Sequence, residues 1–380
     1  MPFSSLGLTP SLLIKIAEQN YTEPYPIQLE AIPAILKRRD IMGIARTGSG
    51  KTVSYVLPIL MNLLGNTVTK NRHVNVLVLV PTRELAIQVS EVFIQFSSGL
   101  PERIKTMAVF GGVSINPQMM GLQGVNILVA TPGRLLELVE SKAVYLTDIE
   151  TLVLDEADKM LNLGFREEMN RIFKLLPRKR QNLLFSATLN ADITNINQII
   201  LRNPLIIKTE EEEDYFEKIQ QLGYFVTEEK KGPLLRYLIK SKNMKQVLVF
   251  TSSVYKADNV ADKLRKNGIN ASAIHSKKSQ GARNEALGKF KSGELCVLVA
   301  TDLISRGIDI QFLPFVINYE LPRSPKDYIH RIGRTGRAES SGEALSFVSQ
   351  EDQHHFKIIQ KKMGKPVTMI DSEQLELRGY

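Results

Sequence analysis

A glycine-rich segment that ends in Lys and Thr gives the strongest chemical signal in the sequence. It reads Ala45-Arg46-Thr47-Gly48-Ser49-Gly50-Lys51-Thr52 and lies between a strand-like run and a helix-length stretch. Backbone N–H groups in such a turn can hold phosphates at the N-terminus of a helix. We expect Lys51 to reach the β- and γ-phosphates and the Thr52 hydroxyl to bind Mg²⁺. The general pattern has Gly at position 45, so the alternative is a glycine-rich turn without this role.

A pair of carboxylates after an apolar run supports the phosphate interpretation. The run Leu152-Val153-Leu154 is followed by Asp155-Glu156-Ala157-Asp158. Phosphoryl transfer needs an anchor for the metal ion and a group that positions or deprotonates the attacking water. Asp155 fits the first role and Glu156 the second. Alone, such acids would usually be a turn or a helix cap, but the preceding phosphate loop favours a catalytic pair.

The elements that must position these residues alternate along the chain. Short apolar, β-branched runs separate helix-length amphipathic stretches, which predicts an α/β fold with mostly parallel sheets. One predicted helix, Val254–Asn267, ends at Gly268, as helices often do. The predicted strands are Asp40–Ala45, Val74–Val80, Asn126–Ala130, Thr151–Leu154 and Asn182–Phe185 in the first half, and Gln246–Phe250, Ala271–Ile274, Cys296–Ala300, Phe315–Tyr319 and Glu343–Val348 in the second.

Length and charge divide the chain into two halves. A chain of 380 residues exceeds the size at which one hydrophobic core usually stops growing. We expect domains at 1–208 and 218–380, joined by an acidic linker at 209–217. The net charge of +9 lies entirely in residues 215–380, whereas residues 1–214 hold 22 basic and 22 acidic side chains. A basic excess of this size is compatible with a nucleic-acid partner and with none.

Composition excludes several classes of protein. A single cysteine allows no internal disulfide, and no window is apolar enough for a membrane span. The N-terminus lacks the basic and apolar regions of a secretory signal. We therefore expect a cytoplasmic protein that does not enter a membrane.

The ordered motifs resemble those of DEAD-box ATP-dependent RNA helicases of helicase superfamily 2, and within that family the bacterial RhlE-type subgroup. The resemblance runs from Phe3 to about Gly364 and implies two tandem RecA-like domains that bind ATP, Mg²⁺ and RNA. It identifies Gln28 as the residue that reads adenine, with Phe3 and Tyr21 beside it. Asn20 and Tyr25 depart from the residues usual in this motif.

The same resemblance assigns coupling and catalytic roles. Ser186 and Thr188 would link the ATP site to strand separation, with hydroxyls that bond Asp158 and His330. Arg334 and Arg337 match the arginine fingers that stabilise charge on the γ-phosphate, and their spacing would let them share a face on a helical turn. Further implied nucleotide contacts come from Gly307 and Asp309, with Asp309 on the ribose.

The implied RNA-binding residues contact phosphate and sugar, so we expect binding that is independent of sequence and weakened by salt. His275-Ser276-Lys277-Lys278 departs from the His-Gly usual in the family. In the first domain the implied contacts are Pro81, Thr82, Arg83, Gly111, Gly112, Thr131, Pro132, Gly133 and Arg134. In the second they are Thr251, Ser252, Gln280, Arg283, Thr301, Asp302 and Arg306.

The resemblance implies a monomer whose domains close on ATP and RNA, with RNA-stimulated hydrolysis and local, non-processive unwinding of short duplexes or remodelling of RNA–protein complexes. Ribosome-assembly or RNA-decay proteins are the implied protein partners. Two alternatives need the same residues: an ATP-gated RNA clamp with little unwinding, and a DNA translocase of the same superfamily.

Overall fold

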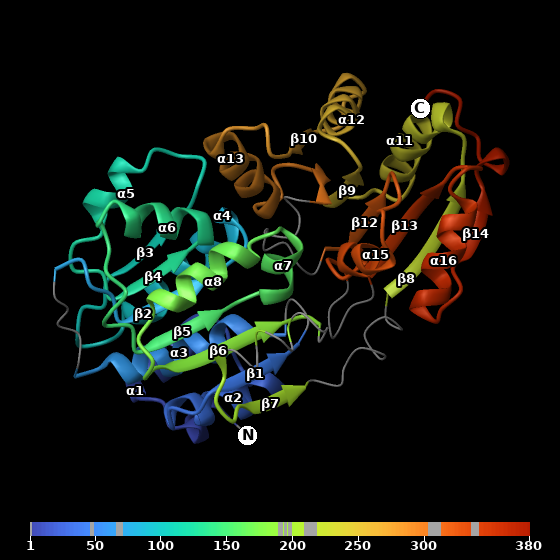
Figure 1. Ribbon diagram of the computed structural model, residues 1–380. Helices are drawn as coiled ribbons and strands as arrows, with labels where there is room; N and C mark the ends of the chain where they lie inside the picture. The colour runs from blue at the N-terminus through green and yellow to red at the C-terminus, as the bar shows by residue number, and fades with distance from the viewer. Residues whose placement is uncertain are drawn as a thin grey trace. The chain divides into compact units, whose positions relative to one another are not determined.

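The computed structural model describes residues 2–45, 49–65, 71–188, 193, 196, 200–208, 219–302, 313–335 and 342–380. The chain divides into two compact units, Met1–Glu210 and Glu211–Tyr380. Each unit contains one seven-stranded sheet (Figure 1). The predicted acidic linker lies outside the described residues, and the predicted domain limits stay a prediction. Within the described ranges, no helix is long and apolar enough to cross a membrane.

The sheet of the first unit has the order β3-β4-β2-β5-β6-β1-β7, and all its paired strands run parallel. Parallel strands place their carboxyl ends at one edge of the sheet, where ligands of α/β proteins bind. The strands are β1 (Ile41–Ile44), β2 (Val76–Leu79), β3 (Thr106–Val109), β4 (Ile127–Ala130), β5 (Thr151–Leu154), β6 (Gln181–Ser186) and β7 (Leu205–Lys208).

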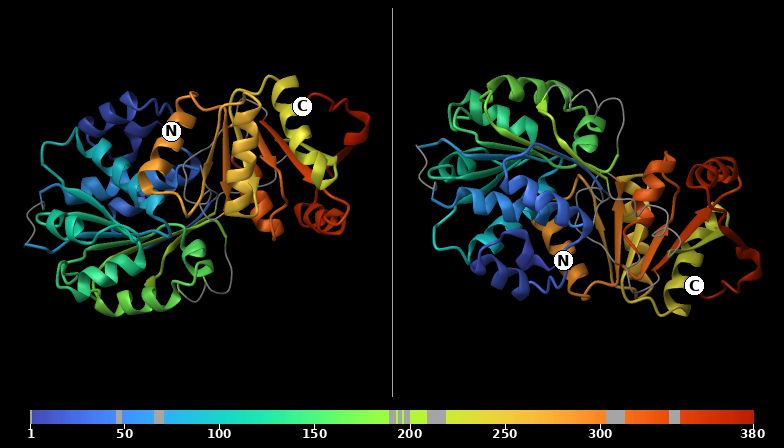
Figure 2. Two further views of the ribbon diagram at one scale, coloured as in Figure 1. Left: turned by 90° about the horizontal axis from the view of Figure 1, so that it is seen from above. Right: turned by 90° about the horizontal axis from the view of Figure 1, so that it is seen from below.

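Helices cover both faces of this sheet (Figure 2). Successive strand residues point to opposite faces, so the sheet packs against one group of helices on one face and a second group on the other. The first group is η1 (Phe3–Leu6), α1 (Pro10–Glu18), α2 (Pro26–Leu36), α3 (Lys51–Leu63) and α4 (Arg83–Ser97). The second is α6 (Pro132–Glu140), α7 (Ala157–Asn162) and α8 (Arg166–Leu175), and the short α5 (Asn116–Gly121) adds Met119 at its margin.

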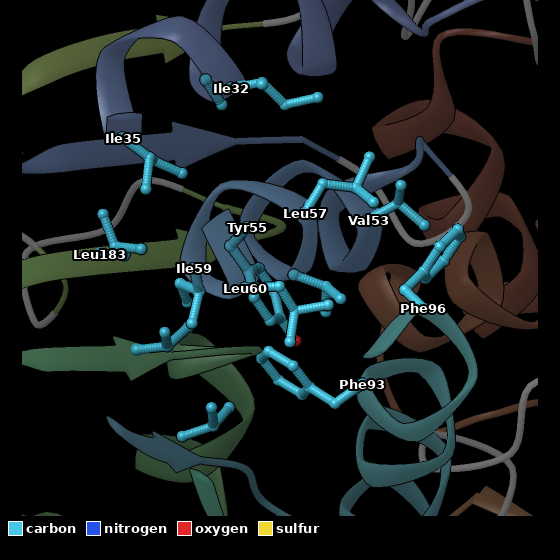
Figure 3. Close-up of a cluster of buried hydrophobic side chains, with 14 of the residues drawn as sticks. Ile32, Ile35, Val53, Tyr55, Leu57, Ile59, Leu60, Phe93, Phe96 and Leu183 are labelled. Carbon is cyan, nitrogen blue, oxygen red and sulfur yellow. The ribbon is translucent and has the colours of Figure 1, made fainter. Parts of the chain in front are cut away.

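Helix α3, which follows the glycine-rich segment, is anchored by the core of this unit. Its Tyr55 is fully buried and packs against Phe93 and Phe185, with ring centroids 6.2 and 5.3 Å away. Figure 3 shows Tyr55 and Phe93 among the aliphatic side chains of this cluster. The packing fixes the helix whose first residue is Lys51.

The second unit repeats the architecture with the order β10-β11-β9-β12-β13-β8-β14, again with parallel pairs. Its strands are β8 (Ile219–Phe225), β9 (Val247–Thr251), β10 (Ala271–Ile274), β11 (Val297–Thr301), β12 (Phe315–Asn318), β13 (Gly342–Val348) and β14 (Thr368–Asp371).

Two groups of helices also cover this second sheet. Helices α11 (Lys231–Ser241) and α12 (Val254–Lys266) pack on one face. The other face carries α13 (Gln280–Lys291), α15 (Pro325–Ile332) and α16 (Gln353–Met363). Short 3-10 turns lie at η2 (Glu228–Lys230) and η3 (Ser372–Gln374).

The two parallel sheets confirm the predicted fold class of two tandem RecA-like domains. Every predicted strand is present with small shifts at its ends, and α12 ends one residue before the predicted Asn267. Four strands were not predicted from the sequence: β3, β7, β8 and β14. Three of them are edge strands and β8 is next to an edge.

Candidate functional site

The glycine-rich segment joins the carboxyl end of β1 to the first turn of α3. Gly50 has φ +84°, a conformation that favours glycine, and a Cβ added there would lie 2.5 Å from Nε2 of Gln28. Lys51 is buried, and its ammonium donates a 2.6 Å hydrogen bond to the carbonyl of Ala45. Arg46, Thr47 and Gly48 lie outside the described residues. The Lys51 side chain therefore points back to Ala45, the residue that follows β1.

Two buried carboxylates lie at the carboxyl end of β5. Asp155 accepts a 2.8 Å hydrogen bond through Oδ2 from the hydroxyl of Tyr55. Glu156 begins α7 with φ 54° and ψ 46°, a left-handed conformation that is uncommon for a residue other than Gly. Its Oε1 accepts a 2.5 Å bond from Nζ of Lys159, and both side chains are at most 8% exposed. Among the described residues, Oε2 of Glu156 has no hydrogen-bond partner.

The electrostatics of Asp155 fit a cation site. Burial raises the pKa of its carboxyl, as does Glu156, while Lys51 and the hydrogen bond from Tyr55 lower it. Burial, followed by the charge of Asp155, raises the pKa of Tyr55 well above its usual value, so this phenol stays a donor. Oδ1 of Asp155 is buried and lacks a partner among the described residues. Carboxylate and hydroxyl oxygens are ligands that Mg²⁺ accepts, so Asp155 and Thr52 fit the predicted ion.

The Ser-Ala-Thr motif connects this site to the end of β6. The hydroxyl of Thr188 donates a 3.1 Å hydrogen bond to Oδ2 of Asp158, as predicted. Ser186 bridges the same turn, since its Oγ donates to the carbonyl of Thr188 and accepts from its N–H. The predicted bond from this motif to His330 stays a prediction.

The residues expected around adenine are more buried than the sequence suggests. Gln28 is fully buried; its amide donates to the carbonyl of Gly50 at 3.1 Å and accepts from the N–H of Tyr25 at 2.9 Å. Phe3 is 5% exposed and packs edge-on against Tyr21, with ring centroids 6.4 Å apart. Gln28 thus holds the phosphate loop, and Phe3 is part of the core. Their contacts with a base stay predictions.

Three expected RNA-binding segments of the first unit converge at the carboxyl ends of adjacent strands. A Cβ on Gly112, which has φ +79°, would lie 2.2 Å from Nη2 of Arg83, so the two segments touch. Arg134 donates to the carbonyl of Val113 at 2.8 Å and pairs with Glu137 at 2.9 Å. Arg134 is 6% exposed, which makes it a brace for the glycine loop.

The remaining expected residues of these segments lie at helix starts. The hydroxyl of Thr82 caps α4 by accepting from the N–H of Leu85 at 3.3 Å. Thr131 precedes α6, whose first two residues are Pro132 and Gly133. The other expected residues are Pro81, two residues after the end of β2, and Gly111, where a Cβ would meet open space.

In the second unit, Asp302 forms a two-pronged ion pair with Arg331, with N···O distances of 2.6 and 2.8 Å. Arg331 is 2% exposed, also donates to Asn318, and lies over the ring of Phe250. Thr301 precedes this aspartate at the end of β11. Arg331 is not among the predicted site residues, although it directly follows the predicted His330 in the sequence.

Arg334, one of the two predicted arginine fingers, lies near the end of α15. His330 occupies the last turn of this helix, which ends at Ile332. Arg334 is 5% exposed and follows in the next turn, so it does not lie on the helix. Arg337 lies outside the described residues, as do Arg306, Gly307 and Asp309.

Two charged side chains, Glu320 and Lys256, support Ser252 of the predicted RNA-binding pair Thr251 and Ser252 through hydrogen bonds. Thr251 ends β9, and the N–H and hydroxyl of Ser252 both donate to Oε2 of Glu320 at 2.7 Å. The ammonium of Lys256 donates to Oε1 of Glu320 at 2.5 Å. Glu320 and Lys256 were also missed, because neither belongs to a recognisable motif.

Gln280 and Arg283 contact each other on the first turn of α13, through a 2.7 Å bond from Nη2 to Oε1. The preceding loop holds a buried His275, whose Nε2 lies 3.0 Å from Oδ2 of Asp258. Lys278 reaches the other oxygen of Asp258 at 3.0 Å. The unusual His-Ser-Lys-Lys segment is therefore fastened to α12.

Comparison with known proteins places this geometry in a family. The family model described as DEAD/DEAH box helicase matches residues 25–196, and that described as helicase conserved C-terminal domain matches residues 229–339. The chain is 38% identical over 375 residues to the Bacillus cereus protein named DEAD-box ATP-dependent RNA helicase CshA, which covers 98% of this chain and 70% of that protein.

Two further proteins, one compared by sequence and one by structure, are similar to this chain over nearly its whole length. The Buchnera aphidicola protein named ATP-dependent RNA helicase DeaD is 36% identical over 98% of this chain, which spans only 61% of that relative. The structure of S. cerevisiae Dbp5 bound to RNA and ADP BeF3 has a TM-score of 0.86 at 29% identity, and the match covers 98% of this chain and 96% of Dbp5. The subgroup predicted from the sequence stays a prediction, but with both domain models matched in order, this protein belongs to the DEAD-box family of helicases.

Proposed function

We propose that the protein is an ATP-dependent RNA helicase, in which RNA stimulates ATP hydrolysis and the hydrolysis cycle drives local unwinding of short RNA duplexes. One observation carries this proposal. Buried Asp155 and Glu156 lie at the end of β5, and Lys51 is near enough to lower the pKa of Asp155. This constellation is suited to phosphoryl transfer. Family membership supports ATP and RNA as the two ligands.

The nucleotide-binding roles follow from the chemistry of each group. Backbone N–H groups at 45–52 bind the phosphates, and Lys51 leaves the carbonyl of Ala45 to reach them. Thr52 and Asp155 would hold Mg²⁺, which would neutralise charge on the phosphates. The amide of Gln28 keeps a second N–H and a second oxygen lone pair beyond its two present hydrogen bonds, and these can contact an adenine edge.

Hydrolysis needs a water molecule in line with the γ-phosphate. The water oxygen forms a bond to the γ-phosphorus, the bond from that phosphorus to the β–γ bridging oxygen breaks, and the proton of the water moves to Glu156. Oε2 of Glu156 is suited to accept it, because Lys159 holds the other oxygen. Arg334 and Arg337 supply positive charge to the γ-phosphate when ATP and RNA close the two domains.

RNA contacts in this proposal come from backbone groups, hydroxyls and Arg side chains at strand ends. Such contacts fix the position of the strand and read no sequence. Asp302 is less suited to touch RNA directly, since both its oxygens bind Arg331. A contact with the ribose 2′-OH would distinguish RNA from DNA. Monomeric state, cytoplasmic location and ribosome-assembly or RNA-decay partners stay predictions.

A strand-separation assay distinguishes the helicase from an ATP-gated clamp. We expect the protein with ATP to separate an RNA duplex of about 10 base pairs, because so few stacked base pairs hold its two strands together weakly. We expect it to fail on much longer duplexes. A protein that binds RNA with ATP and separates neither would support the clamp. Equal activity on RNA and matched DNA would support the translocase.

A further inference from the structure

Basic side chains gather at the amino-terminal edge of the first sheet, where three neighbouring strands begin. Parallel strands β6, β1 and β7 lie side by side (Figure 1), so the segments before them share one edge. This edge is opposite to the one at which the phosphate loop and the Ser-Ala-Thr motif lie. We call these six residues the basic edge: Lys37, Arg39, Arg178, Lys179, Arg180 and Arg202.

Hydrogen bonds join the three segments. Asp40 accepts from the N–H of Asn182 and from the N–H of Arg202, each at 2.8 Å. The guanidinium of Arg202 donates to the carbonyl of Arg178 at 2.7 Å, and Gln181 donates to the carbonyl of Arg39 at 2.8 Å. The backbone of the basic edge is therefore fixed, and its charges are held near one another.

Little negative charge balances this cluster. Within the described ranges no carboxylate forms an ion pair with any of the six, and the buried Asp40 is used by backbone N–H groups. The neighbouring Glu150 lies 3.7 Å from Arg38, which is not one of the six. Burial lowers the pKa of Arg180, the nearby charge of Arg202 lowers it further, and the charge of Asp40 offsets part of this shift. Five of the six side chains are exposed and Arg180 is half-buried.

We propose that the basic edge binds the phosphodiester backbone of RNA that extends beyond the stretch held at the opposite edge of the sheet. Four of the six are Arg, whose planar donors match phosphate oxygens. A strand already held by the helicase site would meet the basic edge at a high local concentration. The inference rests on the proposed RNA binding, and it predicts that only long strands gain affinity.

The test compares two full-length variants that lose the same charge. One carries Arg39→Gln, Arg178→Gln and Lys179→Gln, positions whose side chains are exposed and form no hydrogen bond with any described residue. The matched control carries Lys263→Gln, Lys266→Gln and Lys357→Gln, which are exposed on α12 and α16. Affinity is measured against salt with single-stranded RNA of about 10 and about 40 nucleotides, because one binding fold holds on the order of 4–16 nucleotides.

We expect the first variant to bind the long RNA about 10-fold more weakly than wild type at low salt. The slope of log affinity against log salt should fall by about 0.7 for each phosphate that the variant no longer neutralises. The short RNA should bind all three proteins equally and should stimulate their ATPase equally. An unchanged slope with the long RNA would overturn the inference and leave an acidic protein as the alternative occupant. Failure of the wild-type protein to bind either RNA would instead overturn the proposed function.

Discussion

Nζ of Lys159 lies 2.5 Å from Oε1 of Glu156, and the exposed fractions of the two side chains are 5% and 8%. The pair is three residues apart on the first turn of α7, whose N-cap is Glu156 itself in a left-handed conformation. A buried charge without a partner is strongly destabilising, so each member of this buried pair depends on the other. The ion pair therefore fixes one oxygen of the proposed water-positioning carboxylate and orients the other.

Lys159→Met should lower kcat for RNA-stimulated ATP hydrolysis by about 10- to 100-fold, because small displacements of a catalytic group are costly. The KM for ATP should change little, since Lys159 does not belong to the phosphate loop. Lys159→Arg keeps the charge and should restore most of the rate. Steady-state kinetics of the three proteins measure this, and a Met variant with wild-type kcat would contradict the assigned role.

Gly50→Ala should abolish ATP binding, whereas Gly65→Ala should not. Both glycines have similar positive φ, +84° and +79°, so both substitutions carry the same backbone strain. Only at Gly50 would the new Cβ meet Gln28, at 2.5 Å, and Tyr25, at 2.8 Å. Fluorescent-nucleotide titration and thermal unfolding of both variants separate the contact from the strain. Equal nucleotide affinities in the two variants would show that the contact does not matter.

Glu320 should make the second unit more stable at neutral pH than in acid. Burial alone would raise its pKa, but hydrogen bonds from Lys256 and Ser252 outweigh burial and lower it. Because the pKa of Glu320 is lower in the folded chain, the unfolded chain binds a proton at this carboxyl first as pH falls below about 4.3. The stabilisation is complete above that pH and is lost as pH falls through the folded value.

The corresponding measurement is urea unfolding of wild type and Glu320→Gln between neutral pH and about pH 3, through the carboxyl range. The free energies of unfolding should differ most at neutral pH and converge in acid. Glu351→Gln is the matched control, since Glu351 is exposed on the surface of the same unit. A difference that stays constant with pH would contradict the role of the ionised carboxylate.

The sequence predicts the central strands of both sheets well and their margins poorly. β2, β4 and β5 are buried throughout and read as unbroken apolar runs. The missed β7 and β14 each expose two of their four residues, Ile206 and Lys208 in β7 and Thr368 and Asp371 in β14, so neither is a fully buried strand. Such strands form because a neighbour offers hydrogen bonds, and a single segment does not reveal that neighbour.

The sequence likewise predicts some residues of the candidate site and not others. Motifs identified Lys51 at the start of α3 and Asp155 and Glu156 after β5, because phosphate chemistry restricts the residue types there. Their supports, such as Lys159 and Arg331, depend on side-chain packing that spacing does not reveal. Phe3 packs in the core of the first unit, and its predicted contact with the nucleotide stays a prediction.

The rate of ATP hydrolysis with and without single-stranded RNA tests the central proposal most directly. Wild type should show strong stimulation by RNA and little by matched DNA. Glu156→Gln, which keeps the shape of the side chain but cannot accept the proton, should bind ATP and RNA and hydrolyse at least about 10²-fold more slowly. Hydrolysis in this variant at the wild-type rate, or a wild-type rate that RNA does not change, would contradict the account.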